Sequence, residues 1–122
     1  MVGAGHLGYA LLGYHGFKEY GVDIIAAFDN NPERVDKFIN YKKVFSIDRL
    51  EEIVSRMQIK IGILTVPASV AQELADRMVN AGIKAIWNFA PLKINVPSDV
   101  VVQNENLASS LAVLSQKIKS LN

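Results

Sequence analysis

The chain opens with the six residues Gly3-Ala4-Gly5-His6-Leu7-Gly8, which fit the pattern G-x-G-x-x-G. Each glycine has its own task in such a turn. Gly3 permits a tight turn out of a strand, Gly5 lets the backbone approach a pyrophosphate, and Gly8 lets the next helix pack close to the sheet. A helix that begins near His6 or Leu7 would direct free N–H groups toward the phosphates. The pattern is specific only with a strand before it, a helix after it and an acidic residue about 20 residues later.

The sequence after the turn meets two of these conditions. Apolar residues recur at helical spacing, at Leu7, Ala10, Leu11 and Tyr14. Residues 22–28 are typical of a buried parallel strand, and that strand ends at Asp29. We expect the Asp29 carboxylate to accept the ribose hydroxyls of an adenosine and to repel a 2′-phosphate. Asn30 and Asn31 follow it, with no Arg or Lys directly beside the acid, so NAD(H) is favoured over NADP(H).

The strand that should precede the turn is short. Only Met1 and Val2 remain of an element that belongs at the centre of a sheet. We therefore expect the first strand to be truncated, as in a fragment or a gene model that starts too late.

The rest of the chain alternates between helical and strand-like patterns. We expect strands over residues 43–45, 60–65, 85–88 and 100–103, and helices over 32–40, 48–57, 67–81 and 107–121. Asn31-Pro32, Asp48 and Pro67 provide helix starts, and Gly82 provides a stop. We expect Met57 to point inward, and Val70, Leu74 and Met78 to form the apolar stripe of the third of these helices. This order predicts an α/β fold of the Rossmann type, with a doubly wound parallel sheet and strand order 3-2-1-4-5-6.

The last helix has a narrow apolar seam with a heptad-like period, formed by Leu107, Leu111, Leu114, Ile118 and Leu121. A domain this small has little surface left to cover the seam. We expect a partner subunit or a further domain to cover it, and packing on the chain's own sheet is the alternative.

Composition narrows the function classes. The chain has 122 residues, a net charge of +1 and no cysteine, which argues against a nucleic-acid patch and excludes disulfides and zinc–thiolate sites. His6 lies in the glycine turn and His15 at an expected helix end, without the spacing of a metal site. No G-x-S-x-G elbow, signal peptide or 18-residue apolar span is present, so we expect a cytoplasmic domain with no catalytic residues, metal or membrane partner.

Ligands of doubly wound sheets bind at the carboxyl ends of the strands. The glycine turn and Asp29 would hold pyrophosphate and adenosine. The segments 65–67 and 88–90 would border the nicotinamide, although 65–67 could also be a plain strand-to-helix turn. No substrate domain is left over, which favours a domain that binds or senses the cofactor. The candidate cofactor-binding residues are Gly3, Ala4, Gly5, His6, Leu7, Gly8, Tyr14, Asp29, Asn30, Arg34, Thr65, Val66, Pro67, Asn88, Phe89 and Ala90.

Several motifs together resemble the nucleotide-binding domain of the Rex redox-sensing repressors. They are the glycine turn and the segments 14–17, 26–29, 32–33, 63–68, 82–84 and 88–91. The resemblance implies a homodimeric bacterial repressor that reads the NADH/NAD⁺ ratio, binds NADH in preference to NAD⁺ and NADP(H), and exchanges its C-terminal helix between subunits. It also implies that Tyr14 approaches nicotinamide across the dimer and that Arg34 lies near the adenosine. Operator DNA would be bound by an N-terminal winged-helix domain and released when NADH binds.

The chain departs from that family at three points. The winged-helix domain is absent from residues 1–122, which leaves a dinucleotide-binding domain over 1–105 and a dimerisation helix over 106–122. His15 replaces a proline. Asn106 replaces an aspartate of the family's charge network, and asparagine cannot form the same ion pair. A coenzyme A-binding domain and a nucleotide-binding fragment of an NAD-dependent oxidoreductase remain as alternatives.

Overall fold

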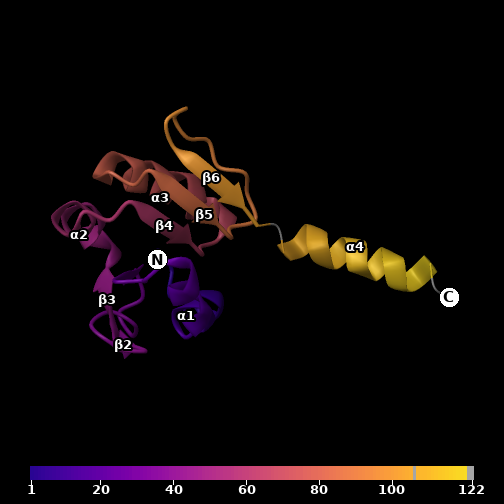
Figure 1. Cartoon of the computed structure of the whole chain (residues 1–122), viewed down its shortest axis with the longest axis horizontal. Helices are drawn as coiled ribbons and strands as arrows, with labels where there is room; N and C mark the ends of the chain where they lie inside the picture. The colour runs from indigo at the N-terminus through magenta and orange to yellow at the C-terminus, as the bar shows by residue number, and fades with distance from the viewer. Residues whose placement is uncertain (106, 121–122) are drawn as a thin grey trace.

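The computed structural model describes residues 1–105 and 107–120. Its strands are β1 (Ala27–Asp29), β2 (Phe38–Ile39), β3 (Lys42–Ser46), β4 (Ile61–Leu64), β5 (Ala85–Asn88) and β6 (Val101–Asn104). Its helices are α1 (His6–Leu12), α2 (Leu50–Met57), α3 (Ala68–Ala81) and α4 (Leu107–Ser120), with 3₁₀ helices η1 (His15–Tyr20) and η2 (Ile47–Arg49). The expected α/β fold with a parallel sheet is confirmed, and strands β4, β5 and β6 lie side by side (Figure 1).

The first residues of the chain lie between two groups of strands. β1 pairs in parallel with β3, and β4 pairs in parallel with β5, which pairs in parallel with β6. Val2 forms parallel bridges with both Phe28 of β1 and Leu64 of β4. The α-amino group of Met1 donates to the Ala26 carbonyl oxygen at 2.9 Å. The carboxyl ends of β1 and β4 are thereby brought beside the glycine turn that follows Val2.

Alternation along the strands separates two apolar clusters, one on each face of the sheet. Phe28 and Leu64 pack with the buried residues of α2 and α3, which include Leu50, Ile53, Ala71, Ala75 and Met78. Ala27 and Ile63, one position earlier in each strand, pack with Met1, Ala4 and Leu12 at the N-terminal end of the chain. Helices α2 and α3 thus cover one face and α1 the other, and the turn that follows Val2 reaches the edge between them.

Residues 32–40 do not form the expected helix. Residues 32–36 form a turn, and its last residue, Asp36, has a positive φ of 66°. β2 then pairs antiparallel with β3 through the two-residue loop Asn40–Tyr41, whose φ values of 49° and 67° are those of a type I′ hairpin turn. The Asp36 N–H donates to the Val44 carbonyl at 2.8 Å. Pairing with β3 satisfies this backbone, so the helix start at Asn31 extends for only one turn.

The helices α2 and α3 differ in detail from expectation. Ser46, and not Asp48, caps the 3₁₀ turn before α2, and its Oγ accepts the Asp48 N–H at 3.3 Å. Met57 is 41% exposed, because the left-handed residue Gln58 ends α2 directly after it. In α3 the buried stripe is Ala71, Ala75 and Met78, because small residues let the helix pack close to the sheet. The expected stop at Gly82 is confirmed, with φ 114°.

The end of α1 and the residues that follow it also differ from the sequence-based expectation. The helix ends at Leu12, two residues earlier than its apolar spacing indicated, and Tyr14 precedes η1 in an extended conformation. His15 begins η1 and does not end α1, so its expected place at a helix C-terminus is wrong. The expected strand over residues 22–28 is confirmed only at its end, in β1.

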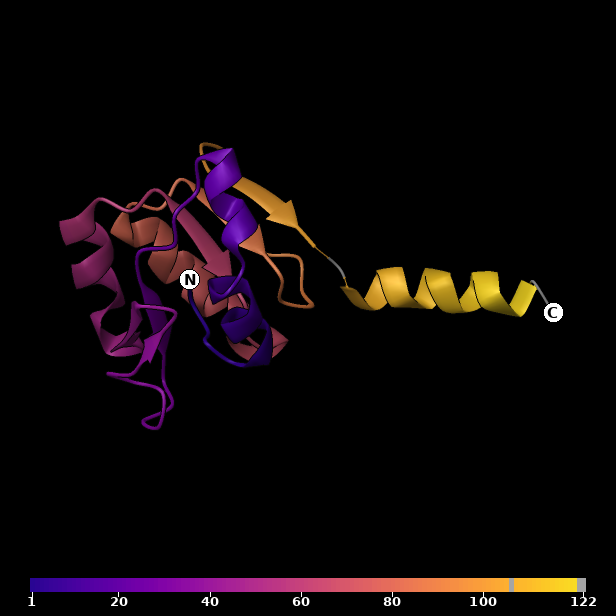
Figure 2. The same ribbon diagram turned by 60° about the horizontal axis from the view of Figure 1, so that its bottom comes forward.

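Helix α4 extends away from the sheet and the other helices in both views (Figures 1 and 2). Leu114 and Ile118 of its seam are each 54% exposed. Asn106, Leu121 and the side chains of Leu107 and Leu111 lie outside the described residues. In the described part of the seam, two large apolar side chains are therefore left in solvent by this single chain.

Candidate functional site

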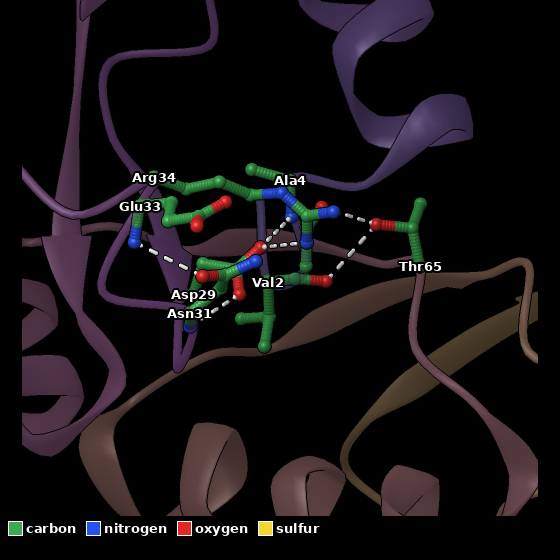
Figure 3. A network of polar contacts seen from close by, with 8 residues as sticks. Val2, Ala4, Asp29, Asn31, Glu33, Arg34 and Thr65 are labelled. Atoms are coloured by element: carbon green, nitrogen blue, oxygen red, sulfur yellow. Dashed lines mark hydrogen bonds and ion pairs between the residues drawn. The ribbon is translucent and has the colours of Figure 1, made fainter. Parts of the chain in front are cut away.

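Asp29, at the carboxyl end of β1, is the centre of a polar network (Figure 3). Its side chain is 6% exposed. Oδ2 accepts the Ala4 N–H at 2.9 Å and the Arg34 guanidinium at 3.1 Å, and Oδ1 accepts the Asn31 N–H at 2.9 Å. Burial raises the pKa of this carboxyl, but the N–H groups of Asn31 and Ala4 and the Arg34 cation outweigh it, so the pKa lies below the ordinary 3.8. The carboxylate is ionised at neutral pH.

The glycine turn is closely packed against its neighbours. Gly3 has φ 97°, a conformation that L side chains rarely adopt, and a Cβ there would lie 2.5 Å from the Thr65 carbonyl oxygen. A Cβ on Gly8 would overlap the Gly3 carbonyl oxygen. Gly5 is the residue before α1, and a Cβ there would have only Arg34 Nη1 near it, at 3.9 Å. Gly3 and Gly8 thus permit the turn itself, while Gly5 leaves its outer side open.

A cavity of about 550 Å³ opens beside this turn. It brings together eight of the candidate cofactor residues, namely Gly3, Gly5, Asp29, Asn30, Arg34, Thr65, Val66 and Pro67. Within the turn, Ala4 and Gly8 are buried and Leu7 is half-buried. The side chain of His6 lies outside the described residues. The volume is in the range of small-molecule sites.

The segment 88–90 and Tyr14 do not line this cavity. Asn88 is 1% exposed, and its Nδ2 donates to the Leu92 carbonyl at 2.7 Å and to Asn104 Oδ1 at 2.9 Å. Its Oδ1 accepts the Ala90 N–H at 3.0 Å. The amide of Asn88 therefore holds the loop after β5 together and ties the end of β5 to the end of β6.

Aromatic rings stand beside that loop. Phe89 packs on Trp87 with ring centroids 4.7 Å apart, and Trp87 meets the edge of Phe17 at 5.8 Å. Tyr14, which is 57% exposed, packs edge-on against Phe17 at 4.9 Å. Four rings thus form a continuous row between η1 and the end of β5.

Sequence reasoning missed the far wall of the cavity. That wall consists of Ile47 in η2 and, along α3, of Ser69, Val70, Glu73, Leu74 and Arg77. Arg77 Nη2 donates to the Ile47 carbonyl and to Glu51 Oε2, both at 2.8 Å, which ties α3 to α2 and η2. The signal was present in the expected stripe of Val70 and Leu74, whose apolar side chains face the cavity because the smaller alanines occupy the sheet-facing positions.

Arg34 lies beside Asp29 in space, although four residues separate them in the chain. No Arg or Lys follows Asp29 directly in the sequence, but the single turn after Asn31 carries Arg34 back over Asp29, so a basic side chain lies beside the acid in space. Among the described residues, no three His, Cys, Asp or Glu side chains gather as a metal site. None of the described helices has the length and apolar character needed to cross a membrane.

One family model and several known proteins match this chain. A family model described as "CoA binding domain" matches residues 1–92. The redox-sensing transcriptional repressor Rex of Treponema denticola is 53% identical over 114 residues, 93% of this chain and 54% of the relative. The Rex of Porphyromonas gingivalis strain W83 is 49% identical over 121 residues, 99% of this chain and 56% of the relative. The chain thus spans about half the length of the curated relatives it matches.

Solved structures of a Rex-family repressor also match this chain. The crystal structure of RSP, a Rex-family repressor, in complex with beta-NAD⁺ and operator DNA matches 98% of this chain and 55% of that chain, with a TM-score of 0.93 and 40% identity. The complex of RSP with beta-NADH matches with a TM-score of 0.90, the same identity, and 98% and 57% coverage.

A glycine turn and a buried carboxylate at the carboxyl edge of a parallel sheet define an α/β domain of the nucleotide-binding class. The chain belongs to the CoA binding domain family. Within it, the resemblance to the Rex repressors that the sequence predicts is confirmed by the relatives and the solved structures, and the relatives are named as repressors and not as enzymes.

Proposed function

We propose that this chain is the NADH-binding sensor part of a redox-sensing transcriptional repressor that responds to the NADH/NAD⁺ ratio. One observation carries the proposal: the ionised Asp29 and the glycine turn meet at a cavity of about 550 Å³. The 40% identity to a Rex-family repressor solved with beta-NADH supports the same ligand. Such a repressor acts in the cytoplasm and needs no catalytic residue.

The cofactor would lie across the turn. Backbone N–H groups of residues 3–8 would face the pyrophosphate. Asp29 Oδ1, which accepts the Asn31 N–H, retains a lone pair for a ribose hydroxyl. Asn30 and Arg34 would border the adenosine, and Thr65, Val66 and Pro67 the middle of the cofactor.

The nicotinamide would lie toward Asn88, Phe89 and Ala90, with Tyr14 supplied across a dimer. The oxidised ring is a cation that would be costly to desolvate in an apolar pocket, so we expect NADH to be favoured over NAD⁺. Rejection of NADPH rests on the buried charge of Asp29. Arg34 offsets part of that charge, so the preference is weaker than a lone carboxylate would produce.

The full sheet would have the order 3-2-1-4-5-6, with Val2 in its first strand. The bridges of Val2 to Phe28 and Leu64 support this order. Residues 1–105 would form the dinucleotide-binding domain. In the longer protein, a winged-helix domain outside residues 1–122 would bind operator DNA.

Residues 106–122 would mediate a homodimer by exchange of α4 between subunits. The exposed Leu114 and Ile118 support this part of the proposal, because a helix with such a seam is stable when a partner buries it. NADH would favour the closed dimer by binding it more tightly than the open one. That differential affinity would release the DNA.

The test uses Trp87, the only tryptophan, which packs on Phe89 at the expected nicotinamide end. NADH absorbs where tryptophan emits, so bound NADH should quench Trp87 saturably, while NADPH and coenzyme A compete poorly. Trp87→Phe provides the control, since it should bind NADH and lose the signal. Absence of quenching, with coenzyme A raising the unfolding temperature, would shift the assignment to coenzyme A.

Coenzyme A is the second candidate because of Arg34. Coenzyme A also presents an adenosine and a pyrophosphate, and it carries a ribose 3′-phosphate. A guanidinium that is 39% exposed at the cavity could pair with that phosphate. Asp29 argues against coenzyme A, because its carboxylate lies 3.1 Å from the same guanidinium and would repel the 3′-phosphate.

A further inference from the structure

The peptide unit between Gly3 and Ala4 is held at both ends, by the side chain of Asp29 at the end of β1 and by that of Thr65 directly after β4. Its N–H, that of Ala4, donates to Asp29 Oδ2 at 2.9 Å. Its carbonyl oxygen, that of Gly3, accepts the hydroxyl of Thr65 at 2.5 Å. Figure 3 shows Thr65 and Asp29 on either side of this peptide.

The Thr65 hydroxyl has one proton and two carbonyl oxygens in reach. The second is that of Val2, at 3.1 Å. The Val2 carbonyl already accepts the backbone N–H of Thr65 at 2.9 Å. The Gly3 carbonyl is closer, so it is the acceptor that gains most from the hydroxyl proton.

The Gly3–Ala4 peptide needs such restraint. Gly3 has φ 97° and no side chain, so this peptide can rotate more freely than one between two L residues. A rotated peptide would turn its carbonyl oxygen toward the ionised Asp29 and would withdraw the Ala4 N–H from it. Under the proposed function, the turn that begins with this peptide faces the pyrophosphate.

We propose that Thr65 is a positioning residue: its hydroxyl, together with the Asp29 carboxylate, fixes the orientation of the Gly3–Ala4 peptide and thereby holds the turn in the form that receives the phosphates of the cofactor. The hydroxyl is thus used within the protein and does not contact the ligand. This assignment rests on the proposed function for its ligand but not for its geometry.

The test compares hydroxyl-bearing and hydroxyl-free variants of the full chain. Thr65→Val keeps the shape without the hydroxyl, Thr65→Ala removes it without crowding the turn, and Thr65→Ser retains it. Ser55→Ala removes an exposed hydroxyl of α2 outside the cavity and is the matched control. The dissociation constants of NADH, ADP and adenosine are measured by calorimetry. We expect NADH and ADP to bind about tenfold more weakly to the Val and Ala variants, and adenosine to bind all variants within about twofold of the original chain.

A second readout needs no ligand. Hydrogen exchange of the Ala4 amide should be faster in Thr65→Val and Thr65→Ala than in the original chain, and should stay slow in Thr65→Ser and Ser55→Ala. Unchanged exchange in the Val and Ala variants, or equally fast exchange in the Ser variant, overturns the role of the hydroxyl. If the original chain binds no NADH, the proposed function fails, and the exchange rates still decide the role of Thr65.

Discussion

The carboxylate of Asp29 and the guanidinium of Arg34 lie 3.1 Å apart, with the carboxylate buried and the guanidinium 39% exposed at the cavity. The pair joins the acid that would bind ribose to a cation that can move into solvent. A phosphate on the ribose would therefore meet a negative and a positive group together. Under the proposed function, the balance between these two charges would determine which adenine nucleotide the site prefers.

Replacing Asp29 by Asn tests this balance. The variant removes the charge, frees Arg34 and leaves the Ala4 and Asn31 N–H groups with an amide. We expect NADH binding to weaken by about tenfold, because the ribose loses its charged acceptor, and NADPH binding to weaken less or to improve. Titration of both cofactors against the original chain measures the change. An equal loss for the two cofactors would show that Asp29 does not discriminate between them.

The same variant has an effect on acid stability. Because the folded pKa of Asp29 lies below 3.8, its carboxylate stabilises the folded chain above that pH, and this stability is lost as the pH falls through the folded pKa. Urea denaturation of the original chain and of Asp29→Asn at a series of pH values would show the difference. We expect the acid-dependent loss in stability to be smaller in the variant, and identical profiles would contradict the assignment.

Gly8 and Gly62 form a matched pair for substitution by alanine. A Cβ on Gly8 would overlap the Gly3 carbonyl oxygen, which the backbone holds in place, whereas a Cβ on Gly62 would meet the terminal methyl of Met78, which can rotate away. We expect Gly8→Ala to cost about 3 kcal/mol of unfolding free energy and to abolish NADH binding, and Gly62→Ala to cost about 1 kcal/mol and to retain binding. Urea unfolding and NADH titration measure both effects. Equal costs would show that the turn can yield as easily as the core.

The seam of α4 provides a test of the dimer. Leu114→Asp and Ile118→Asp place a charge where a partner subunit would bury an apolar side chain, and we expect the dimer to dissociate at least tenfold more readily. Gln116→Asp adds the same charge on the side of the same helix opposite the seam, and should leave the proposed dimer intact. Sedimentation velocity at micromolar concentration measures the association. A chain that stays dimeric with both seam variants would show that α4 does not mediate the contact.

Much of the fold follows from local patterns. The glycine turn, β5 and the stop of α3 at Gly82 were predictable, because each depends on residues that are adjacent in the chain. The expected strand over residues 43–45 is confirmed as β3, but β2 and its hairpin with β3 were not predictable. The residues of β2 follow the helix start Asn31-Pro32, and only their pairing with β3 makes an extended strand the better conformation.

The candidate site likewise has residues that local spacing predicts and contacts that it does not. Asp29 and the glycine turn could be assigned from spacing, and eight of the candidate residues do line one cavity. Two interactions could not be assigned from spacing. The ion pair between Arg34 and Asp29 depends on the turn after Asn31, and the hydrogen bond from the Thr65 hydroxyl to the Gly3 carbonyl joins residues 62 positions apart. Asn88 has the residue type of a ligand contact, yet its side-chain hydrogen bonds are made to its own loop and to Asn104 of β6.

The sequence by itself determined the class of fold, the position of the turn and the identity of the acid, because glycine geometry and hydrophobic periodicity act over a few residues. Only the tertiary structure decided how charge is balanced at the acid, which side chains close the cavity and how the Gly3–Ala4 peptide is held. Those features depend on hydrogen bonds and contacts between strands and helices that are far apart in the chain. Their geometry exists only once the sheet has brought the carboxyl ends of β1 and β4 to either side of Val2.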